Sequence, residues 1–315
     1  MKKRILCVGD LVCDVVMPVP LPIQANAHQT SPTRRIEPGG AGNFMFAAHN
    51  MGLDVTSVGT VGDDYLGKII VDGLKEGGID TSGIIVQPNT TSTLVIVLVD
   101  VDQHAHVYVG NYGEGYPVAY PTSLDELSQY DGAYFLGYTF AEHRTTDLAA
   151  VALKKAHDAG LKIYFDVGPF MGNVPIELTK KILTMVDVLL ATEDEIEHVA
   201  DGRTGQDVYD YLIDQGIELI VEKQGHAGCR LIAQEYNELF PAFHANVVDT
   251  VGAGDCFGGA FVACHLRGMP LDQCAQVANA MGMASVVKLA AGRNAPTMSE
   301  VKAVLADHHI EIDLD

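Results

Sequence analysis

The sequence has few basic residues for its length. Its 315 residues include 20 Lys and Arg against 41 Asp and Glu, which gives a formal net charge of −21. Nucleic acids and anionic membrane surfaces attract proteins through clustered basic side chains, and the field of this chain would repel them. We therefore expect neither a nucleic acid nor a membrane as partner, and any phosphate that binds must be held by local contacts.

Cysteine pairs and long apolar runs are also missing. The six cysteines form no C-x-x-C pair, so neither a zinc knuckle nor a disulfide framework is indicated, and free thiols point to the reducing cytoplasm. The apolar stretch near Met1 is interrupted by Asp10 and Asp14, which argues against a secretion signal. The longest strongly apolar run, Leu94 to Val99, is far shorter than the roughly 18 residues of a membrane-spanning helix. The sequence predicts a soluble cytoplasmic protein.

Short apolar runs alternate with segments of helical spacing along the chain. The runs are rich in Val and Ile, as buried parallel strands are, and they cover 5–9, 55–59, 133–137, 162–166, 186–191 and 218–221. Helical segments are expected at 43–51, 145–159, 208–215, 252–268, 271–289 and 298–307. This alternation predicts one α/β domain over 1–315, with a doubly wound, mostly parallel sheet flanked by helices.

Two segments interrupt this alternation. Val15 to Ile36 is rich in Pro and has no helical period, and Thr93 to Tyr112 is typical of a β-hairpin that turns around Asp100 to Gln103. They can be two separate surface excursions. We favour a small β-lid, formed by about 12–38 and 90–112, that covers a site at the edge of the sheet.

The segment from Asp249 to Phe261 carries the most chemical information. Gly252, Ala253 and Gly254 have small side chains, precede Asp255, and open an apolar helical run. An anion can therefore approach the unpaired N–H groups of the helix start, next to a carboxylate that can accept a proton from a hydroxyl. These are two requirements of phosphoryl transfer to an alcohol. The alternative is a Gly-rich helix start that Asp255 merely caps.

The same segment resembles, over its whole length, the C-terminal signature of the ribokinase-like (PfkB) carbohydrate kinases. The resemblance implies that Asp255 is the catalytic base and that the backbone amides from Gly252 to Asp255 form an anion hole. It extends from Gly9 to about Pro296 and implies the ribokinase-like fold for the chain.

A second motif, which begins at Pro38, places two glycines before a helical segment. The glycines allow the backbone to turn tightly and to approach a ligand, and the side-chain amide of Asn43 can bind hydroxyls. The resemblance makes Gly39, Gly40 and Asn43 the sugar-binding element of the family.

Asp14 follows the first apolar run, and the corresponding aspartate of the family binds sugar hydroxyls. Asp10 is an alternative contact, and either carboxylate can be no more than a turn cap. The short interval Gly40–Asn43 is similar to that of the heptose-phosphate kinase branch. Arg34 and Arg35 would then receive a phosphate that is already on the sugar, although a solvated basic pair is the simpler explanation.

Nucleotide contacts are expected between these two motifs. Lys223, Gly225 and Gly228 follow a buried run, where two glycines can form no more than a hairpin. The segment resembles the K-x-G-x-x-G element of the family, which lines the ATP phosphates, and Asn279 would lie near the adenine. Mg²⁺ is expected because the chain concentrates few basic residues that would neutralise the phosphates.

The N-x-x-E motif of the family orients that Mg²⁺ ion. Here Glu195 keeps the glutamate, whereas Thr192 replaces the asparagine, which leaves the arrangement around the ion open. A helix capping box is the alternative interpretation of this pair, and the two roles can coexist. Asp166 adds a carboxylate at the end of an apolar run, where open α/β sheets bind ligands.

Several other features carry little weight. His104 and His106 lack a third ligand at a suitable spacing and fit a polar hairpin face, and Cys256 fits a small buried hydrophobic residue. The sequence has no G-x-x-x-x-G-K-[ST] loop, and no G-x-G-x-x-G follows the first apolar run. These absences argue against a P-loop kinase and against a dehydrogenase.

The combined motifs predict an ATP-dependent sugar kinase that transfers the γ-phosphoryl group to a hydroxyl of a carbohydrate or sugar phosphate. One alternative is a nucleoside kinase on the same fold, for which an aromatic content of 7% without Trp is low. The other is a catalytically silent regulator that binds sugar or nucleotide. The resemblance also allows a K⁺ ion near Asp249 and the 290–294 loop, and a homodimer through the lid.

Overall fold

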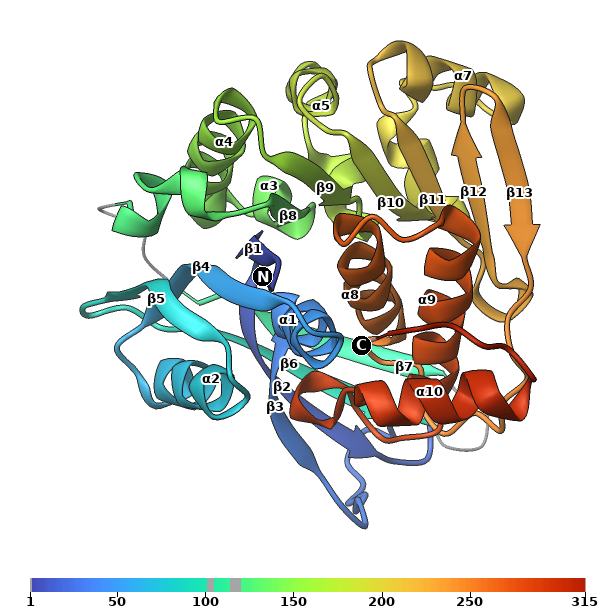
Figure 1. The fold of residues 1–315 in the computed structure, drawn as a ribbon. Helices are drawn as coiled ribbons and strands as arrows, with labels where there is room; N and C mark the ends of the chain where they lie inside the picture. The colour runs from blue at the N-terminus through green and yellow to red at the C-terminus, as the bar shows by residue number, and fades with distance from the viewer. Residues whose placement is uncertain (1, 101–104, 114–119, 315) are drawn as a thin grey trace.

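The computed structural model describes residues 2–100, 105–113 and 120–314. Within those ranges, nine strands form one large sheet in the order β13-β12-β11-β10-β9-β8-β1-β4-β5 (Figure 1). The strands are β1 (Arg4–Val8), β4 (Asp54–Gly62), β5 (Asp80–Gln87), β8 (Gly132–Leu136), β9 (Lys162–Asp166), β10 (Val188–Thr192), β11 (Leu219–Lys223), β12 (Cys229–Ala233) and β13 (Tyr236–Phe240).

Most of the large sheet is parallel. Each neighbouring pair from β11 across the sheet to β5 is parallel, while β12 and β13 add an antiparallel hairpin at one side. The inner strand β8 is buried along its whole length, as expected for a parallel sheet that is covered on both faces. The predicted doubly wound α/β fold is confirmed, and the segments that leave the carboxyl ends of β1, β8 and β9 meet at one edge.

Helices form a layer on each face of the large sheet (Figure 1). One layer contains α3 (Tyr138–Ala141), α4 (His143–Asp158), α5 (Ile176–Leu183) and α7 (Gln206–Asp214), and its apolar side chains form one core with the sheet. The other contains α1 (Ala41–Asn50), α2 (Tyr65–Glu76), α8 (Ala253–Leu266), α9 (Leu271–Val286) and α10 (Met298–Asp307), with a core of its own. Helix α8 packs between α1 and α9, so its first turn is held by neighbours on both sides.

A second, small sheet has the strand order β3-β2-β6-β7 among the described residues. It consists of β2 (Leu11–Pro18), β3 (Arg35–Gly40), β6 (Thr93–Val99) and β7 (His106–Asn111). The two interrupting segments of the sequence therefore do join in one sheet, because β2 pairs with β6. The predicted hairpin is confirmed by the β6–β7 pairing, and most of its expected turn lies outside the described residues. Whether the small sheet acts as a lid stays a prediction.

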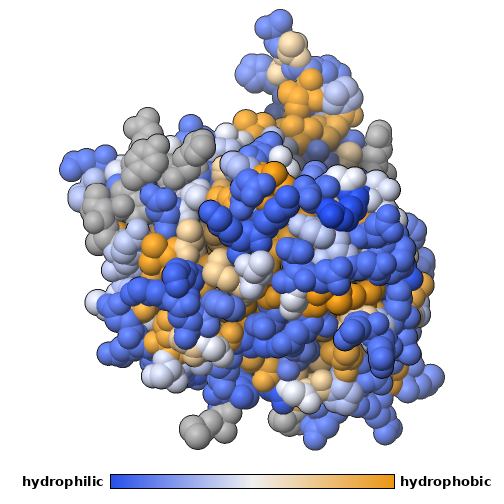
Figure 2. Space-filling model, turned by 90° about the horizontal axis from the view of Figure 1, so that it is seen from above, coloured by the Kyte–Doolittle hydropathy of each residue, from blue (hydrophilic) through white to orange (hydrophobic). Residues whose placement is uncertain are grey.

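The surface of the molecule is mostly hydrophilic in the view of Figure 2, with hydrophobic residues in scattered groups and on one projecting part. This appearance agrees with the large excess of acidic residues in the chain. In the part of the chain that the structure describes, no helix combines the length and the apolar character that crossing a membrane requires.

Candidate active site

Asp255 lies in the first turn of α8, and the residue before the helix is Gly252 in the left-handed conformation, with φ of 71°. A Cβ atom at Gly252 would lie 2.6 Å from the Cβ of Ala291 and 3.0 Å from the side chain of Asn43. Both the backbone conformation and the close neighbours therefore require glycine here. This glycine allows α8 to begin in contact with α1 and the 290–294 loop.

The start of α8 offers backbone N–H groups to an anion. The first turn of any helix leaves such groups without intrahelical partners, and no described side chain caps this one. The N–H of Ala253 donates to the carbonyl of Thr250 at 3.2 Å, whereas Gly254 is exposed. The helix dipole adds to the attraction for negative charge. The open end of this helix start is at Gly254 and Asp255, and its function as an anion hole stays a prediction.

Asn43 connects the two sequence motifs. Its Nδ2 donates to Oδ2 of Asp255 at 3.0 Å, and its Oδ1 accepts from the N–H of Gly292 at 2.8 Å. The side chain is buried, and it follows Gly40, which has φ of 54° and precedes α1. The structure therefore places the predicted sugar-binding element directly against the predicted catalytic base.

The environment of Asp255 suits a group that must bind and release a proton near neutral pH. Burial, followed by the negative charge of Asp166, raises the pKa of Asp255 to about 7. The hydrogen bond from Asn43 and the charge of Lys223 act in the opposite direction. A general base is most effective when its pKa lies close to the working pH.

Asp14 lies in β2 and faces the glycines of β3. A Cβ atom on Gly39 would lie 1.7 Å from Oδ2 of Asp14, so the absence of a side chain at this position makes room for the carboxylate. Burial, followed by the charges of Asp255 and Asp10, raises the pKa of Asp14 to about 7. The predicted acceptor residues and the predicted base therefore share one acidic site.

Lys223, at the end of β11, pairs with Asp166, at the end of β9. Its Nζ lies 2.8 Å from Oδ1 and 3.0 Å from Oδ2 of Asp166, and the hydroxyl of Tyr134 donates to Oδ2 at 3.2 Å. The side chain of Asp166 is buried, and that of Lys223 is nearly buried. A Cβ atom on Gly254 would lie 3.8 Å from this ammonium group. Lys223 is therefore close to the open end of the anion hole, as a phosphate contact needs to be.

Gly228 and Asn279 lie against one backbone segment, at Phe240 and Pro241. Gly228 has φ of 108°, and a Cβ atom there would lie 2.0 Å from the carbonyl oxygen of Phe240. Nδ2 of Asn279 donates to the carbonyls of Phe240 and Pro241, at 3.1 Å each. The structure thus brings Gly228 and Asn279 together, with the side chain of Asn279 engaged by the backbone. Gly225 is linked to them through its carbonyl, which accepts from the N–H of Gly228 at 3.2 Å.

Glu195 lies in the short helix α6 (Glu193–Ile196) after β10. It forms a capping box with Thr192, in which Glu195 Oε2 accepts from the N–H of Thr192 at 2.8 Å. The capping alternative is thus observed, and Glu195 also contributes to the electrostatic environment of Asp255. No cluster of three or more metal-binding side chains occurs among the described residues. The carboxylate of Glu195 offers oxygen ligands of the kind that Mg²⁺ prefers. Phosphate and water would supply the remaining ligands.

Two contacts of acidic side chains in this region were not predicted from the sequence. His106 of β7 approaches Asp249, with 3.0 Å between Nε2 and Oδ1. Arg293, next to Gly292, bonds to Glu37 of β3 at 2.8 Å, while Arg35 lies 3.7 Å from the same Glu37. The His106–Asp249 and Arg293–Glu37 partners lie 143 and 256 residues apart in the sequence, so no local pattern indicated these contacts.

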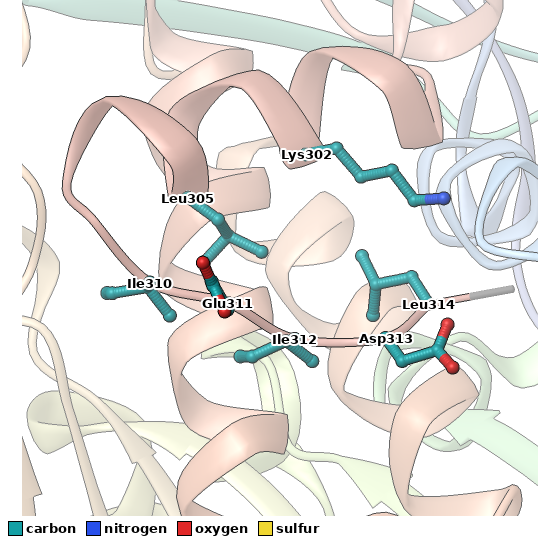
Figure 3. Close-up of a pocket in the computed structure, with 7 residues that line it drawn as sticks. All are labelled: Lys302, Leu305, Ile310, Glu311, Ile312, Asp313 and Leu314. Carbon is teal, nitrogen blue, oxygen red and sulfur yellow. The ribbon is translucent and has the colours of Figure 1, made fainter.

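A hollow of about 440 Å³ elsewhere is not part of this site. Figure 3 shows that it lies between α10, which contributes Lys302 and Leu305, and the C-terminal segment from Ile310 to Leu314. None of the residues that line it belongs to α1, α8 or the small sheet.

The chain is similar to known kinases. Residues 2–298 match the model of the pfkB family carbohydrate kinases. The ATP-dependent ribose-1-phosphate kinase of Halopiger xanaduensis is 28% identical over 306 residues, which cover 96% of this chain and 98% of the relative. The aminoimidazole riboside kinase of Salmonella typhimurium is 24% identical over 320 residues, with 98% and 97% covered.

The fold is shared with solved structures. The ribokinase of Arabidopsis thaliana, complexed with ribose and ATP, superimposes with a TM-score of 0.81 at 20% identity, over 97% of this chain and 99% of the other. The family match extends over nearly the whole chain and includes both glycine motifs and Asp255. We conclude that the chain belongs to the pfkB family of carbohydrate kinases.

Proposed function

We propose that this protein transfers the γ-phosphoryl group of ATP to a hydroxyl of a sugar or of a sugar-containing acceptor. The observation that carries the proposal is the hydrogen bond between Asn43 and Asp255. It joins the acceptor element of one motif to the base and the anion hole of the other. The family membership supports the reaction class, and several named relatives are ATP-dependent kinases or sugar kinases.

Asp255 acts on the acceptor in this proposal. Its carboxylate orients the acceptor hydroxyl and takes its proton as the oxygen forms a bond to the γ-phosphorus, while the bond from that phosphorus to ADP breaks. The N–H groups of Gly254 and Asp255, at the open end of this segment, would stabilise the charge on the transferred group, whereas the N–H of Ala253 already donates to Thr250. Asp14, Gly39 and Asn43 hold the acceptor, and a pKa of about 7 keeps a useful fraction of Asp255 ionised at neutral pH.

ATP would lie on the side of α8 opposite to the residues that hold the acceptor. Lys223 is near Gly254 and would contact a phosphate, while Gly225, Gly228 and Asn279 would line the remainder. Mg²⁺ would supply positive charge to the phosphates, and Glu195 would orient its water ligands. A related structure holds ATP and Mg²⁺, which supports this part of the proposal.

The test is ADP production that depends on an added acceptor. Asp255→Asn should reduce turnover by at least about a hundredfold, because the acceptor loses its base. Binding of ATP should change little. Asp214→Asn, at an exposed position of α7, serves as control and should retain full turnover.

Full activity of Asp255→Asn would refute the assignment of the base. The regulator alternative predicts a different pattern, in which sugar binds tightly and no acceptor gives ADP. The nucleoside alternative predicts turnover with ribosides.

Three further properties belong to the same proposal. A K⁺ ion near Asp249 is tested by comparing rates in potassium and in sodium. A homodimer through the small sheet is supported by three exposed side chains on its edge strand β7, those of Val107, Tyr108 and Val109. Analytical ultracentrifugation, which measures the mass of the particle in solution, tests it. The cytoplasm is supported by cysteines that are all free and buried, and fractionation of cells tests it.

A further inference from the structure

The loop before α10 lies against the acceptor side of the candidate site. It contains the 3₁₀ turn η6 (Gly292–Asn294), which contacts β3 and α1. Gly292 has φ of 58°, and a Cβ atom there would lie 2.7 Å from the Cβ atom of Glu37 and 3.2 Å from the carbonyl oxygen of Pro38. The backbone of the loop therefore packs directly on the strand that leads to the two glycines of the acceptor element.

The side chain of Arg293 connects this loop to two other elements. Its Nε lies 2.8 Å from Oε2 of Glu37 in β3, and its Nη1 lies 2.9 Å from Oε2 of Glu76 at the end of α2. The side chain of Glu37 is only 8% exposed, whereas that of Glu76 is 67% exposed. The contact with Glu37 therefore contributes more, because water and salt screen a shielded ion pair less than an exposed one.

Gly292, the neighbour of Arg293, sets the orientation of the Asn43 side chain. Its N–H donates to Oδ1 of Asn43 at 2.8 Å, which leaves Nδ2 of Asn43 to donate to Oδ2 of Asp255 at 3.0 Å. An amide group that turned over would place a donor against the N–H of Gly292 and an acceptor against the carboxylate of Asp255. The N–H of Gly292 therefore disfavours that orientation.

We propose that Arg293 is a positioning residue for the phosphoryl transfer. Its ion pair with Glu37 holds the N–H of Gly292 on Asn43, and Asn43 in turn directs its Nδ2 at the base, Asp255. Arg293 acts through Asn43 and needs no contact with the substrate. The inference rests on the proposed kinase function and adds a residue to its site.

Replacement of Arg293 by Met tests the proposal in the ADP assay with the best acceptor. Met keeps much of the length of the side chain but forms no ion pair. We expect kcat to fall about tenfold, because small displacements of groups around the reacting atoms weaken the contacts of the transition state. KM for ATP should change by less than about twofold, since the loop lies against the acceptor element and not against the predicted nucleotide residues.

Arg203→Met is the matched control. The side chains of Arg203 and Arg293 are each 39% exposed, and Arg203 also pairs with a carboxylate, that of Asp201 at 3.2 Å. Arg203 lies over the ring of Tyr211, in the helical layer on the opposite face of the large sheet. This variant should retain the kcat of wild type. Arg293→Lys, which keeps a cation for Glu37 without the planar guanidinium, should recover part of the lost rate.

A second variant keeps the test valid if Arg293→Met does not fold. The single substitution leaves the carboxylate of Glu37 with Arg35, whose Nη1 lies 3.7 Å from Oε1. Combining Glu37→Gln with Arg293→Met removes the buried charge as well, and this double variant should show the same loss of kcat. Circular dichroism measures the folding of each variant. A folded double variant with the kcat of wild type would overturn the proposal.

A double-mutant cycle tests whether Arg293 acts through Asn43. In the Asn43→Ala background, the further change Arg293→Met should lower kcat by less than about twofold, because the side chain that it positions is already absent. Two effects that multiply would show that Arg293 acts by another route, and this result would also overturn the proposal.

The pH profile supplies a readout that a general loss of stability would not move. The hydrogen bond from Asn43 lowers the pKa of Asp255. Four charged neighbours also interact with Asp255, namely Asp166, Lys223, Glu195 and Asp14. These neighbours remain in Arg293→Met, so a weakened hydrogen bond from Asn43 should move the acid limb of log kcat/KM to higher pH. A fall in kcat without this movement would contradict the proposed route.

The positioning function and the kinase function fail in different ways. If wild type produces no ADP with any acceptor, the kinase function fails, and the function of Arg293 fails with it. If wild type is active and Arg293→Met keeps both its kcat and its pH profile, only the positioning function fails.

Discussion

His106 of the small sheet lies 3.0 Å from Asp249, measured from Nε2 to Oδ1, and so connects β7 to the segment that precedes α8. Asp249 is almost fully buried, at 2% accessibility. Its Oδ1 also accepts from the N–H of Val251, and its Oδ2 accepts from the N–H of Ala290. One carboxylate thus joins the small sheet, the loop before the anion hole and the 290–294 loop.

Loss of this connection should impair the positioning of the anion hole. We expect His106→Ala to lower kcat about tenfold with a smaller effect on KM for the acceptor, because small displacements of the amides weaken transition-state contacts. His106→Gln, which can still donate to Asp249, should recover part of the rate. Steady-state kinetics measure both variants. A kcat equal to wild type in His106→Ala would show that His106 has no positioning function.

The rate of the reaction should depend on pH through Asp255. A base must be ionised, and burial raises the pKa of Asp255 to about 7, so kcat/KM should fall as the pH drops below about 7. Asn43→Ala removes a hydrogen bond that lowers this pKa and should move the acid limb to higher pH. A profile of log kcat/KM against pH measures the midpoint. A rate that stays constant down to pH 5 would contradict this prediction.

The same raised pKa predicts a cost in stability. The folded state holds the proton of Asp255 more tightly than the unfolded state does, so stability should decrease as the pH rises from about 4 to about 7. Asp255→Asn removes this ionisation and should increase the free energy of unfolding at pH 8 by up to ~2 kcal/mol. Denaturant unfolding of both proteins at pH 4.5 and pH 8 is the measurement. A difference that does not shrink toward pH 4.5 would point to another cause.

Gly39 should be required for binding of the acceptor. A methyl group at this position would lie 1.7 Å from a carboxylate oxygen of Asp14, so Gly39→Ala must displace that carboxylate. We expect KM for the acceptor to rise at least about tenfold, as for the loss of a hydrogen bond to a charged group, while KM for ATP changes little. Gly282→Ala is the control, because a Cβ there meets nothing within 4 Å and alanine favours helices. Equal kinetics of the two variants would exclude the proposed contact.

Lys223 should contribute both to stability and to catalysis. Lys223→Met leaves the buried carboxylate of Asp166 without its cation, which should cost about 3–5 kcal/mol of folding free energy. Adding Asp166→Asn removes the unpaired charge and should restore most of that loss. KM for ATP should stay high in the double variant if Lys223 contacts a phosphate. Recovery of both stability and activity would leave Lys223 with a structural function alone.

The local pattern of residues was sufficient to predict most of the fold. The runs rich in Val and Ile predicted the strands, and 162–166 and 298–307 coincide with β9 and α10. Helix α2 was not expected. It contains Gly67 and Gly73, which disfavour helices, but a Cβ at either position would lie less than 3 Å from a neighbouring segment. Close packing in the folded protein therefore explains these glycines.

The sequence by itself determined the chemistry that is present: glycines before a helix, an aspartate in its first turn, and a second glycine pair near the N-terminus. Only the tertiary structure decided which of these groups meet. Asn43 and Asp255 are 212 residues apart, and His106 and Asp249 are 143 apart. Periodicity reports the local conformation of the backbone. Contacts across such distances depend instead on the order of the strands in the sheet, which makes β1, β8 and β9 neighbours although they are far apart in the sequence.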